Sequence, residues 1–366
     1  MNELLHEIRD LIRAARQAVV HSVDVIQVLT NFEIGRRIVE HEQGGEERAE
    51  YGIALLKELS AALTAEFGRG FSRTNLEYMR KFYLTYQDRA AQIAQAQSAK
   101  FLTDKKKSQI PSGKSVAARK SQMLSGTFAI PFNLSWSQYV FLISISNPDE
   151  RSFYEIEAAC GGWTLPELKR QFNSGLYERL ALSRDKEGVR KLAAEGQIVA
   201  RPEDLLKEPY VLEFLGLDEK ARYSESDLES AIIDKLEHFL LELGKGFLFE
   251  ARQKRLTFDE EHFYVDLVFY NRLLHCYVLI DLKIGRLNHG DLGQMQMYVN
   301  YFDRFVKLDE EASTVGIVLC KKKHDALVEI TLPKDANIHA REYRLYLPDK
   351  ELLRQKLTEW GEEVGM

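Results

Sequence analysis

The chain has 366 residues, of which 45% are hydrophobic and 29% are charged, and its formal net charge is −6. These values exclude a disordered chain and a polycation, and the length suggests about two domains. Nucleic-acid contacts would therefore have to come from local basic surfaces. No apolar run approaches the roughly 18 residues that span a bilayer, and the N-terminal residues lack the apolar stretch of a signal peptide. We therefore expect a cytoplasmic protein with no membrane partner.

Helical periodicity dominates the first part of the chain. Apolar residues recur at three- and four-residue spacing in residues 31–43 and 51–68. The turn Gly68-Arg69-Gly70 leads into residues 71–83, where Ser72 fits the N-cap of a further helix. A helix, a short glycine turn and a second helix are the outline of a helix-turn-helix.

Residues 88–128 lose this periodicity and are typical of a flexible basic insertion. Helical patterning returns at residues 134–145 and 150–172, where Thr164 and Glu167 fit a capping box after a glycine turn. This is a second helix-turn-helix outline, although two packed helices are also a common structural unit. We expect basic side chains on the polar sides of the two candidate recognition helices to contact DNA, namely Arg73, Arg80, Lys81, Lys169 and Arg170.

From residue 224 the pattern becomes mixed. A helix ended by glycine is followed by three strand-like runs at 247–256, 263–270 and 276–284, then a helix at 291–305 and a strand at 313–320. This order predicts a mixed sheet flanked by helices, and an α+β chain overall. We predict a helical N-terminal domain at 1–180, a connecting helical segment at 181–222, a sheet domain at 223–350 and a C-terminal helical tail at 351–366.

Several charges interrupt the predicted sheet domain. Asp281 and Lys283 end an apolar strand and share one of its faces, because side chains alternate along a strand. Asp266 lies within the preceding strand, and an antiparallel hairpin would bring it near Asp281. Glu229 falls within the apolar stripe of the first helix, so it is the acid of that helix most suited to face the sheet. Gln294 and Tyr298 are four residues apart and share one face of the later helix.

Oxygen ligands without clustered His or Cys suit a hard ion such as Mg²⁺, with Mn²⁺ as a substitute. Each signal has a simpler alternative. An Asp-x-Lys at a strand end is in most proteins a solvated terminus, and Glu229 could form an ordinary salt bridge. Gln294 and Tyr298 could simply border a core helix. The combination of Asp266, Asp281, Lys283 and the order of the elements favours a catalytic site.

These residues resemble the PD-(D/E)XK nuclease core and, more closely, the YhcG-like family of two-domain bacterial proteins. The resemblance lies in Asp266, in "IDLKIG" with Asp281 and Lys283, and in "GQMQMY" with Gln294 and Tyr298. The helical stretches "FGRGFSRTNLEYMRKFY", "LSWSQY" and "RSFYEIEAACGGWTLPELKRQ" are also similar to that family. The acid of the third strand is Asp281, where Glu is more frequent, and the basic insertion is longer than usual.

The resemblance implies a restriction-endonuclease-like domain and a metal-dependent endonuclease that cuts DNA in genome defence or in DNA repair and recombination. It implies that Asp266, Asp281 and the backbone carbonyl of Leu282 hold Mg²⁺ and that Lys283 positions or activates water. Glu229 and Gln294 would assist in catalysis, and Tyr298 would contact DNA. RNA as a substrate and self-association stay open. The alternative is a non-catalytic DNA-binding or assembly protein that retains a nuclease fold.

Overall fold

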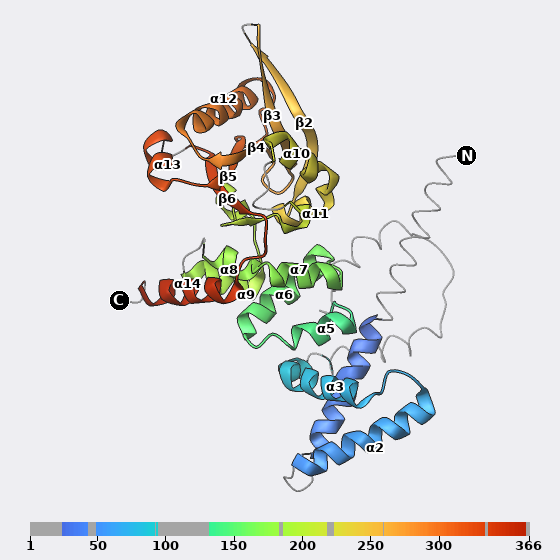
Figure 1. Cartoon of the computed structure of the whole chain (residues 1–366). Coiled ribbons are helices and arrows are strands. Elements are labelled where there is room, and N and C mark those ends of the chain that lie inside the picture. The colour runs from blue at the N-terminus through green and yellow to red at the C-terminus, as the bar shows by residue number, and fades with distance from the viewer. Residues whose placement is uncertain are drawn as a thin grey trace, which may run out of the picture. The chain divides into compact units, whose positions relative to one another are not determined.

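The computed structural model describes residues 24–42, 49–91, 93, 132–182, 186–217, 223–258, 260–333 and 336–363 (Figure 1). By its internal contacts the chain forms two compact units, Met1–Arg151 and Ser152–Met366. Most of the predicted basic insertion, from residue 94 to residue 128, lies outside the described residues. None of the helices within the described ranges is long and apolar enough to cross a membrane.

The first unit is helical, as the sequence predicts. Ser72 caps α3 by accepting the N–H of Asn75 at 3.3 Å, which confirms the predicted helix start. Leu76 and Phe82 of α3 are buried, and the Phe82 ring packs against Phe132 at 4.9 Å between centroids. The elements are a helix over residues 24–42, α2 (Ala49–Phe67), α3 (Arg73–Tyr86), η1 (Gln87–Arg89), α5 (Trp136–Leu142) and the first turn of α6 (Pro148–Gly161).

Helices α7 (Leu165–Asn173) and α8 (Leu176–Ala181) belong by their contacts to the second unit, together with the sheet, although their sequence pattern groups them with the N-terminal helices. Thr164 and Glu167 form the predicted capping box at the start of α7, with the N–H of Thr164 donating to Glu167 Oε2 at 2.6 Å. The other helical elements of this unit outside the sheet region are the rest of α6, α9 (Lys186–Glu195), η2 (Pro202–Leu205), η3 (Glu213–Leu215) and α14 (Lys350–Glu363).

Within the described residues the sheet has six strands in the order β1-β6-β5-β4-β3-β2. Strands β2, β3 and β4 pair antiparallel, whereas β4, β5, β6 and β1 pair parallel, so the predicted mixed sheet is confirmed. Two strands were not predicted: β1 is only two residues long, and β6 carries several charges. The strands are β1 (Tyr210–Val211), β2 (Phe247–Phe258), β3 (Glu261–Asn271), β4 (Cys276–Arg286), β5 (Val315–Lys322) and β6 (Ile338–Arg344).

The predicted helix before the sheet is in fact two helices, α10 (Glu225–Asp234) and α11 (Leu236–Leu243). The chain leaves helical geometry at Lys235, whose φ is −120° and ψ is 30°. Because α10 and α11 are separate helices, each can pack on the sheet with its own axis direction. The helices on the C-terminal side are α12 (His289–Phe305) and α13 (Asp325–Thr331).

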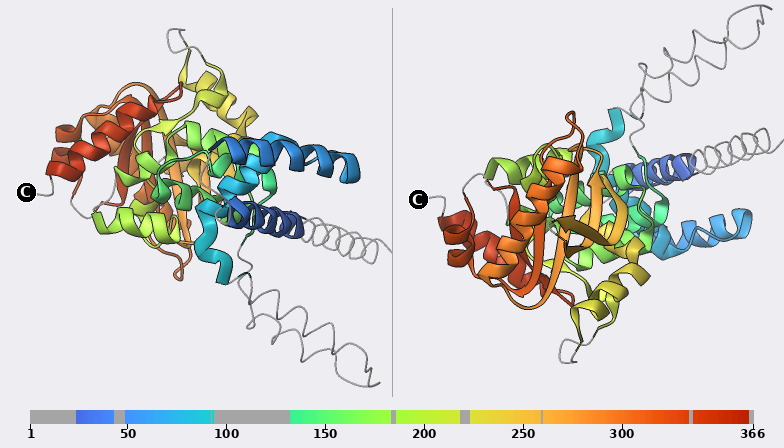
Figure 2. Two further views of the ribbon diagram at one scale, coloured as in Figure 1. Left: turned by 90° about the horizontal axis from the view of Figure 1, so that it is seen from below. Right: turned by 90° about the horizontal axis from the view of Figure 1, so that it is seen from above.

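Alternation along the central strand β4 builds two apolar layers. Ile280 and Leu282 pack in one core cluster with side chains of α10 and α11, whereas Leu279 packs in a second cluster with side chains of α12. Figures 1 and 2 show α12 along one face of the sheet, with α10 and α11 near the start of β2. The acidic residues of β3 and β4 therefore lie in a sheet that helices cover on both faces.

Candidate active site

Asp266 and Asp281 meet where β3 and β4 separate. The antiparallel ladder ends at the pair Leu267 and Ile280, and one further step in that register brings Asp266 opposite Asp281. Asp266 Oδ2 accepts the backbone N–H of Leu282 at 2.8 Å. Asp281 is 2% exposed, whereas Asp266 is only half-buried. The predicted pairing of the two acids is thus present in the structure.

The electrostatics of Asp281 reflect this crowding. Burial, and after it the negative charge of Asp266, raise the pKa of Asp281 to about 7. Lys283 opposes this rise in pKa, because its Nζ forms an ion pair with Asp281 Oδ2 at a distance of 2.7 Å. Burial lowers the pKa of Lys283, but the charges of Asp281 and Glu225 outweigh it and raise the pKa overall. The site therefore holds a charged ammonium beside a carboxylate pair that is costly to keep fully ionised.

Glu229 reaches the acid pair only through another side chain. Its carboxylate pairs with Arg252 and accepts a hydrogen bond from Gln253 Nε2 at 2.5 Å. The same Nε2 donates to Asp266 Oδ1 at 3.0 Å. Arg252 and Gln253 were missed in the sequence. The register of the β2–β3 hairpin could have indicated Gln253, because this pairing places Gln253 opposite Asp266.

Gln294 and Tyr298 share a face of α12, as predicted, but Tyr298 is fully buried. Its hydroxyl donates to the carbonyl of Tyr264 at 2.7 Å and accepts from Gln294 Nε2 at 2.5 Å. Burial, and then Asp281, raise the pKa of Tyr298 to about 12. The predicted DNA contact by Tyr298 is therefore wrong, because this ring is part of the core beneath the acid pair.

The basic residues predicted to contact DNA lie in different settings. In the first unit, Arg73 pairs with Glu77 at 2.9 Å and Arg80 pairs with Glu42 at 2.6 Å, but both guanidinium side chains stay partly exposed. Lys81 is exposed in the same helix. In the second unit, Lys169 on α7 is exposed, whereas the Arg170 side chain is only 13% exposed.

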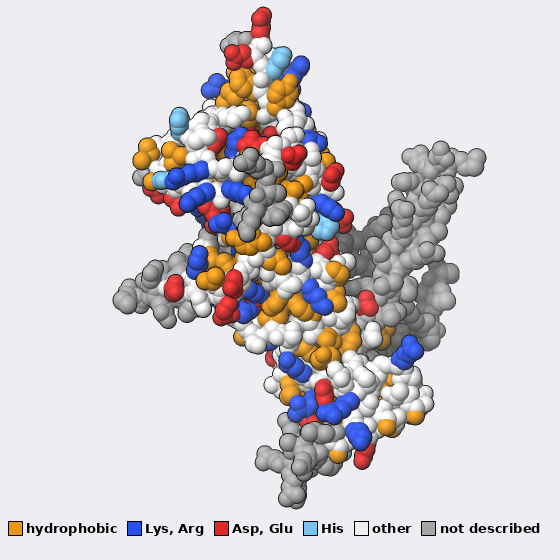
Figure 3. All heavy atoms as spheres, in the orientation of Figure 1, with side chains coloured by type: hydrophobic (Ala, Val, Ile, Leu, Met, Phe, Trp, Pro, Cys, Tyr) orange, Lys and Arg blue, Asp and Glu red, His pale blue; other side chains and the backbone are white. Residues whose placement is uncertain are grey.

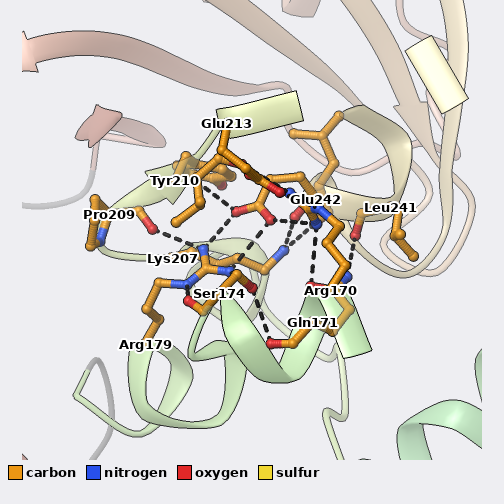
Figure 4. Close-up of polar contacts among 12 residues, drawn as sticks. Arg170, Gln171, Ser174, Arg179, Lys207, Pro209, Tyr210, Glu213, Leu241 and Glu242 are labelled. Carbon is orange, nitrogen blue, oxygen red and sulfur yellow. Dashed lines mark hydrogen bonds and ion pairs between the residues drawn. The ribbon is translucent and has the colours of Figure 1, made fainter. Parts of the chain in front are cut away.

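Arg170 belongs to a buried ionic network centred on Glu242 of α11 (Figure 4). It bonds Glu213 Oε1 at 2.9 Å, and the fully buried Arg179 donates to Glu242 Oε1 at 2.6 Å. Burial raises the pKa of Glu242, but Arg179, Lys207 and Arg170 together outweigh it and lower the pKa to about 2. Arg170 thus links α7 to α11 through its ion pair with Glu242. Its predicted role as a DNA contact does not fit this burial.

The donor set at the acid pair fits a hard divalent cation. No group of three or more His, Cys, Asp or Glu side chains in the described part of the chain could hold a metal ion. Two adjacent carboxylates are nevertheless sufficient for Mg²⁺, which is commonly bound by one or two carboxylates together with water and phosphate oxygens. A cation would also relieve the repulsion that raises the pKa of Asp281. The role of the Leu282 carbonyl stays a prediction.

Both parts of the chain match known protein families. Residues 203–358 match the YhcG PDDEXK nuclease domain, and residues 7–179 match the DUF1016 N-terminal domain. The chain is 43% identical over 349 residues to the protein named "Putative nuclease YhcG" of Escherichia coli (strain K12), covering 95% of this chain and 91% of that protein.

Two solved structures match a smaller part. They are a repair endonuclease from Pyrococcus abyssi at 17% identity and an EndoMS–dsDNA complex at 16% identity, each with a TM-score of 0.24. Each match covers 36% of this chain and 50% of the other chain, so this chain spans half the length of each of those two proteins. From the extent and identity of the match to YhcG, the chain belongs to the YhcG family of proteins with a PDDEXK nuclease domain.

Proposed function

We propose that the protein is a Mg²⁺-dependent endonuclease that hydrolyses DNA phosphodiester bonds, with Mn²⁺ as a substitute. The observation that carries this proposal is the convergence of Asp266, Asp281 and Lys283 at the point where β3 and β4 separate. Two carboxylates in a partly buried site can hold a divalent ion, and an ammonium beside them can stabilise negative charge during phosphodiester hydrolysis.

Asp266 and Asp281 would hold the ion, and the backbone N–H of Leu282 together with Gln253 would keep Asp266 in place. A bound divalent ion would lower the pKa of a water molecule and offset the negative charge on the phosphate. In the proposed reaction, water oxygen bonds to phosphorus as the bond from phosphorus to the 3′-oxygen breaks. The products are a 5′-phosphate and a 3′-hydroxyl. The attacking water loses one proton, and the leaving 3′-oxygen gains one.

Lys283 would act as a hydrogen-bond donor and a cation in this reaction rather than as a base. Its pKa is raised, so the ammonium keeps its proton at neutral pH and can orient water or a phosphate oxygen. Glu229 would position Asp266 through Gln253. Gln294, half-buried on α12 next to Tyr298, would help to fix the water or the phosphate.

Affinity for DNA would come in part from the exposed basic side chains of α3 and α7, which are Arg73, Arg80, Lys81 and Lys169. We propose a targeting role for the helix-turn-helix outlines that carry them. A cellular role in genome defence or in DNA repair and recombination belongs to the proposal through the family resemblance.

The test is incubation of the full chain with linear, circular, branched and single-stranded DNA, and with RNA, in Mg²⁺, Mn²⁺ or EDTA. We expect the parent to cut circular DNA with either ion and not in EDTA. Asp266→Ala, Asp281→Ala and Lys283→Ala should each abolish cutting while DNA binding is retained, and Glu310→Ala, at an exposed acid outside the site, should cut like the parent. DNA binding without cutting of any nucleic acid would instead support the non-catalytic alternative.

A further inference from the structure

The register between β4 and β5 changes directly after the acid site. Lys283 pairs with Cys320, and the next residues to pair are Arg286 and Lys322. The chain therefore advances three residues along β4 for two residues along β5. This one-residue excess is a β-bulge, and bulges next to active sites re-aim side chains. Exposed Gly285 lies within it, and a glycine inside a strand often marks a bulge.

The bulge returns Arg286 to the catalytic face of the sheet. In a regular strand, Arg286 would point away from Asp281 and Lys283, because it is an odd number of residues from both. Cys320 and Lys322 are two residues apart on β5 and share one face. Their partners Lys283 and Arg286 therefore also share one face. The sheet thus presents Lys283, Arg286 and Lys322 on the side that carries Asp281.

Arg286 and Lys322 form a like-charge pair. Both are exposed, and they are Cα partners on strands that lie about 4.8 Å apart. Neighbouring cations have carboxylate partners: Lys323 pairs with Glu208 at 3.1 Å, and Arg344 pairs with Glu342 at 2.7 Å. Among the residues that the structure describes, no carboxylate pairs with Arg286 or Lys322. Two adjacent uncompensated cations repel each other and favour binding of an anion.

Figure 3 shows that Lys and Arg side chains gather on the face of this unit over β5 and β6. Arg286 is three residues from Lys283, which is at most about 10 Å along the strand at roughly 3.3 Å per residue. Arginine binds phosphate in a bidentate manner, and lysine adds a second positive charge. The pair is therefore placed to bind a phosphate near the one that is cut.

We propose that Arg286 and Lys322 together bind one backbone phosphate of the substrate DNA strand, next to the scissile phosphate. This inference rests on the proposed nuclease function and adds a phosphate-binding subsite to it. The two residues position the strand so that the scissile phosphate meets Asp281 and Lys283.

The first test is the salt dependence of DNA binding by the full chain in EDTA, where no metal-dependent cutting occurs. Arg286→Ala/Lys322→Ala should weaken binding and reduce the slope of log K against log salt by roughly 0.9 for duplex DNA, the value for one phosphate. Lys356→Ala removes an exposed lysine on α14 and should leave the slope unchanged. An equal slope for the parent and the double variant would refute the subsite. A decrease in slope twice as large as the value for one phosphate would show that the two residues bind separate phosphates and would refute a shared one.

The second test introduces one neutral methylphosphonate linkage at successive positions near a mapped cleavage site. In the parent, one position beside the cut should lower single-turnover cleavage about tenfold or more. The double variant should already be slower and should be insensitive to that linkage. The single variant Arg286→Lys keeps both positive charges, so it should keep part of the parent's sensitivity to that linkage. Equal sensitivity of the parent and the double variant would contradict the inference.

The two proposals fail separately. Absence of cutting by the parent on every nucleic acid would refute the nuclease proposal, while the salt slope in EDTA would still measure the subsite. Normal cutting with an unchanged slope and unchanged linkage sensitivity in the double variant would refute only the subsite. Because both side chains are exposed, we expect the variants to melt like the parent, which thermal unfolding would verify.

Discussion

Asp266 accepts the backbone N–H of Leu282 at 2.8 Å, so the carboxylate of β3 is fixed to β4 at the residue that follows Asp281. Asp266 therefore cannot move away from Asp281 without losing this hydrogen bond. Burial, together with the repulsion between the two acids, raises the pKa of Asp281 to about 7. In the absence of a cation this arrangement is a local cost to the folded state.

Asp281→Asn should relieve that cost. The amide keeps the size of the side chain and removes its charge, so the metal-free variant should melt at or above the temperature of the parent. The parent should be stabilised by Mg²⁺ or Mn²⁺, by about 2.7 kcal/mol at an ion concentration a hundred times Kd, and the variant should lose most of this gain. Thermal unfolding in EDTA and across a metal titration measures both effects. Equal metal stabilisation of the two proteins would place the metal site elsewhere.

Glu229→Gln should slow cleavage without weakening DNA binding, because Glu229 acts on Asp266 through Gln253. We expect a decrease in kcat of roughly tenfold with KM for DNA nearly unchanged, which is the sign of an interaction needed mainly in the transition state. Gln253→Ala should have a similar effect, and the double variant should be little worse than either single one. Additive losses in single-turnover rate would show that the two residues act independently.

Glu242→Gln should destabilise the second unit strongly. The substitution leaves Arg170 and Arg179 without their shared carboxylate and removes the negative charge near the buried Lys207. Breaking a buried ion pair by removing one partner costs about 3–5 kcal/mol. The free energy of unfolding from urea denaturation measures the loss. Glu310→Gln, at an exposed acid, should change it by less than about 0.5 kcal/mol. A small loss for Glu242→Gln would mean that this network contributes little to the fold.

The neighbouring residues Lys169 and Arg170 should respond in opposite ways. Lys169→Ala should reduce the salt dependence of DNA binding and leave stability nearly unchanged, because Lys169 is exposed. Arg170→Ala should lower stability and leave the salt slope of the folded protein unchanged, because its guanidinium bonds Glu213 and the carbonyl of Val211. A reduced salt slope in a folded Arg170→Ala protein would argue against this assignment.

His339 should make the fold sensitive to acid. Burial, reinforced by the charge of Arg341, lowers the pKa of His339 from 6.5 to about 4. As the pH falls from 6.5 to 4, the unfolded chain takes up the proton first, so stability is lost over this range. The contribution is at most about 3 kcal/mol. Urea denaturation between pH 7 and pH 4 should show a smaller loss for His339→Gln, and identical pH profiles would exclude His339 as the cause.

The sequence by itself predicted the succession of strands and helix along the chain from residue 247 to residue 320 and the meeting of Asp266 with Asp281. Both follow from short-range rules. Alternation places side chains on a face, and a short connection makes neighbouring strands pair as a hairpin. The same rules placed Lys283 beside Asp281, and local capping signals at Ser72 and Thr164 located two helix starts.

Only the tertiary structure showed that Arg170 is buried, that Glu229 contacts Asp266 through Gln253, and that a register shift places Arg286 on the face of the sheet that carries Asp281. Each depends on a partner in another element. Arg170 and Glu242 are 72 residues apart in the chain. Whether a charged side chain faces water or an opposite charge depends on which elements pack together. The periodicity of a single helix or strand carries no information about that distant partner.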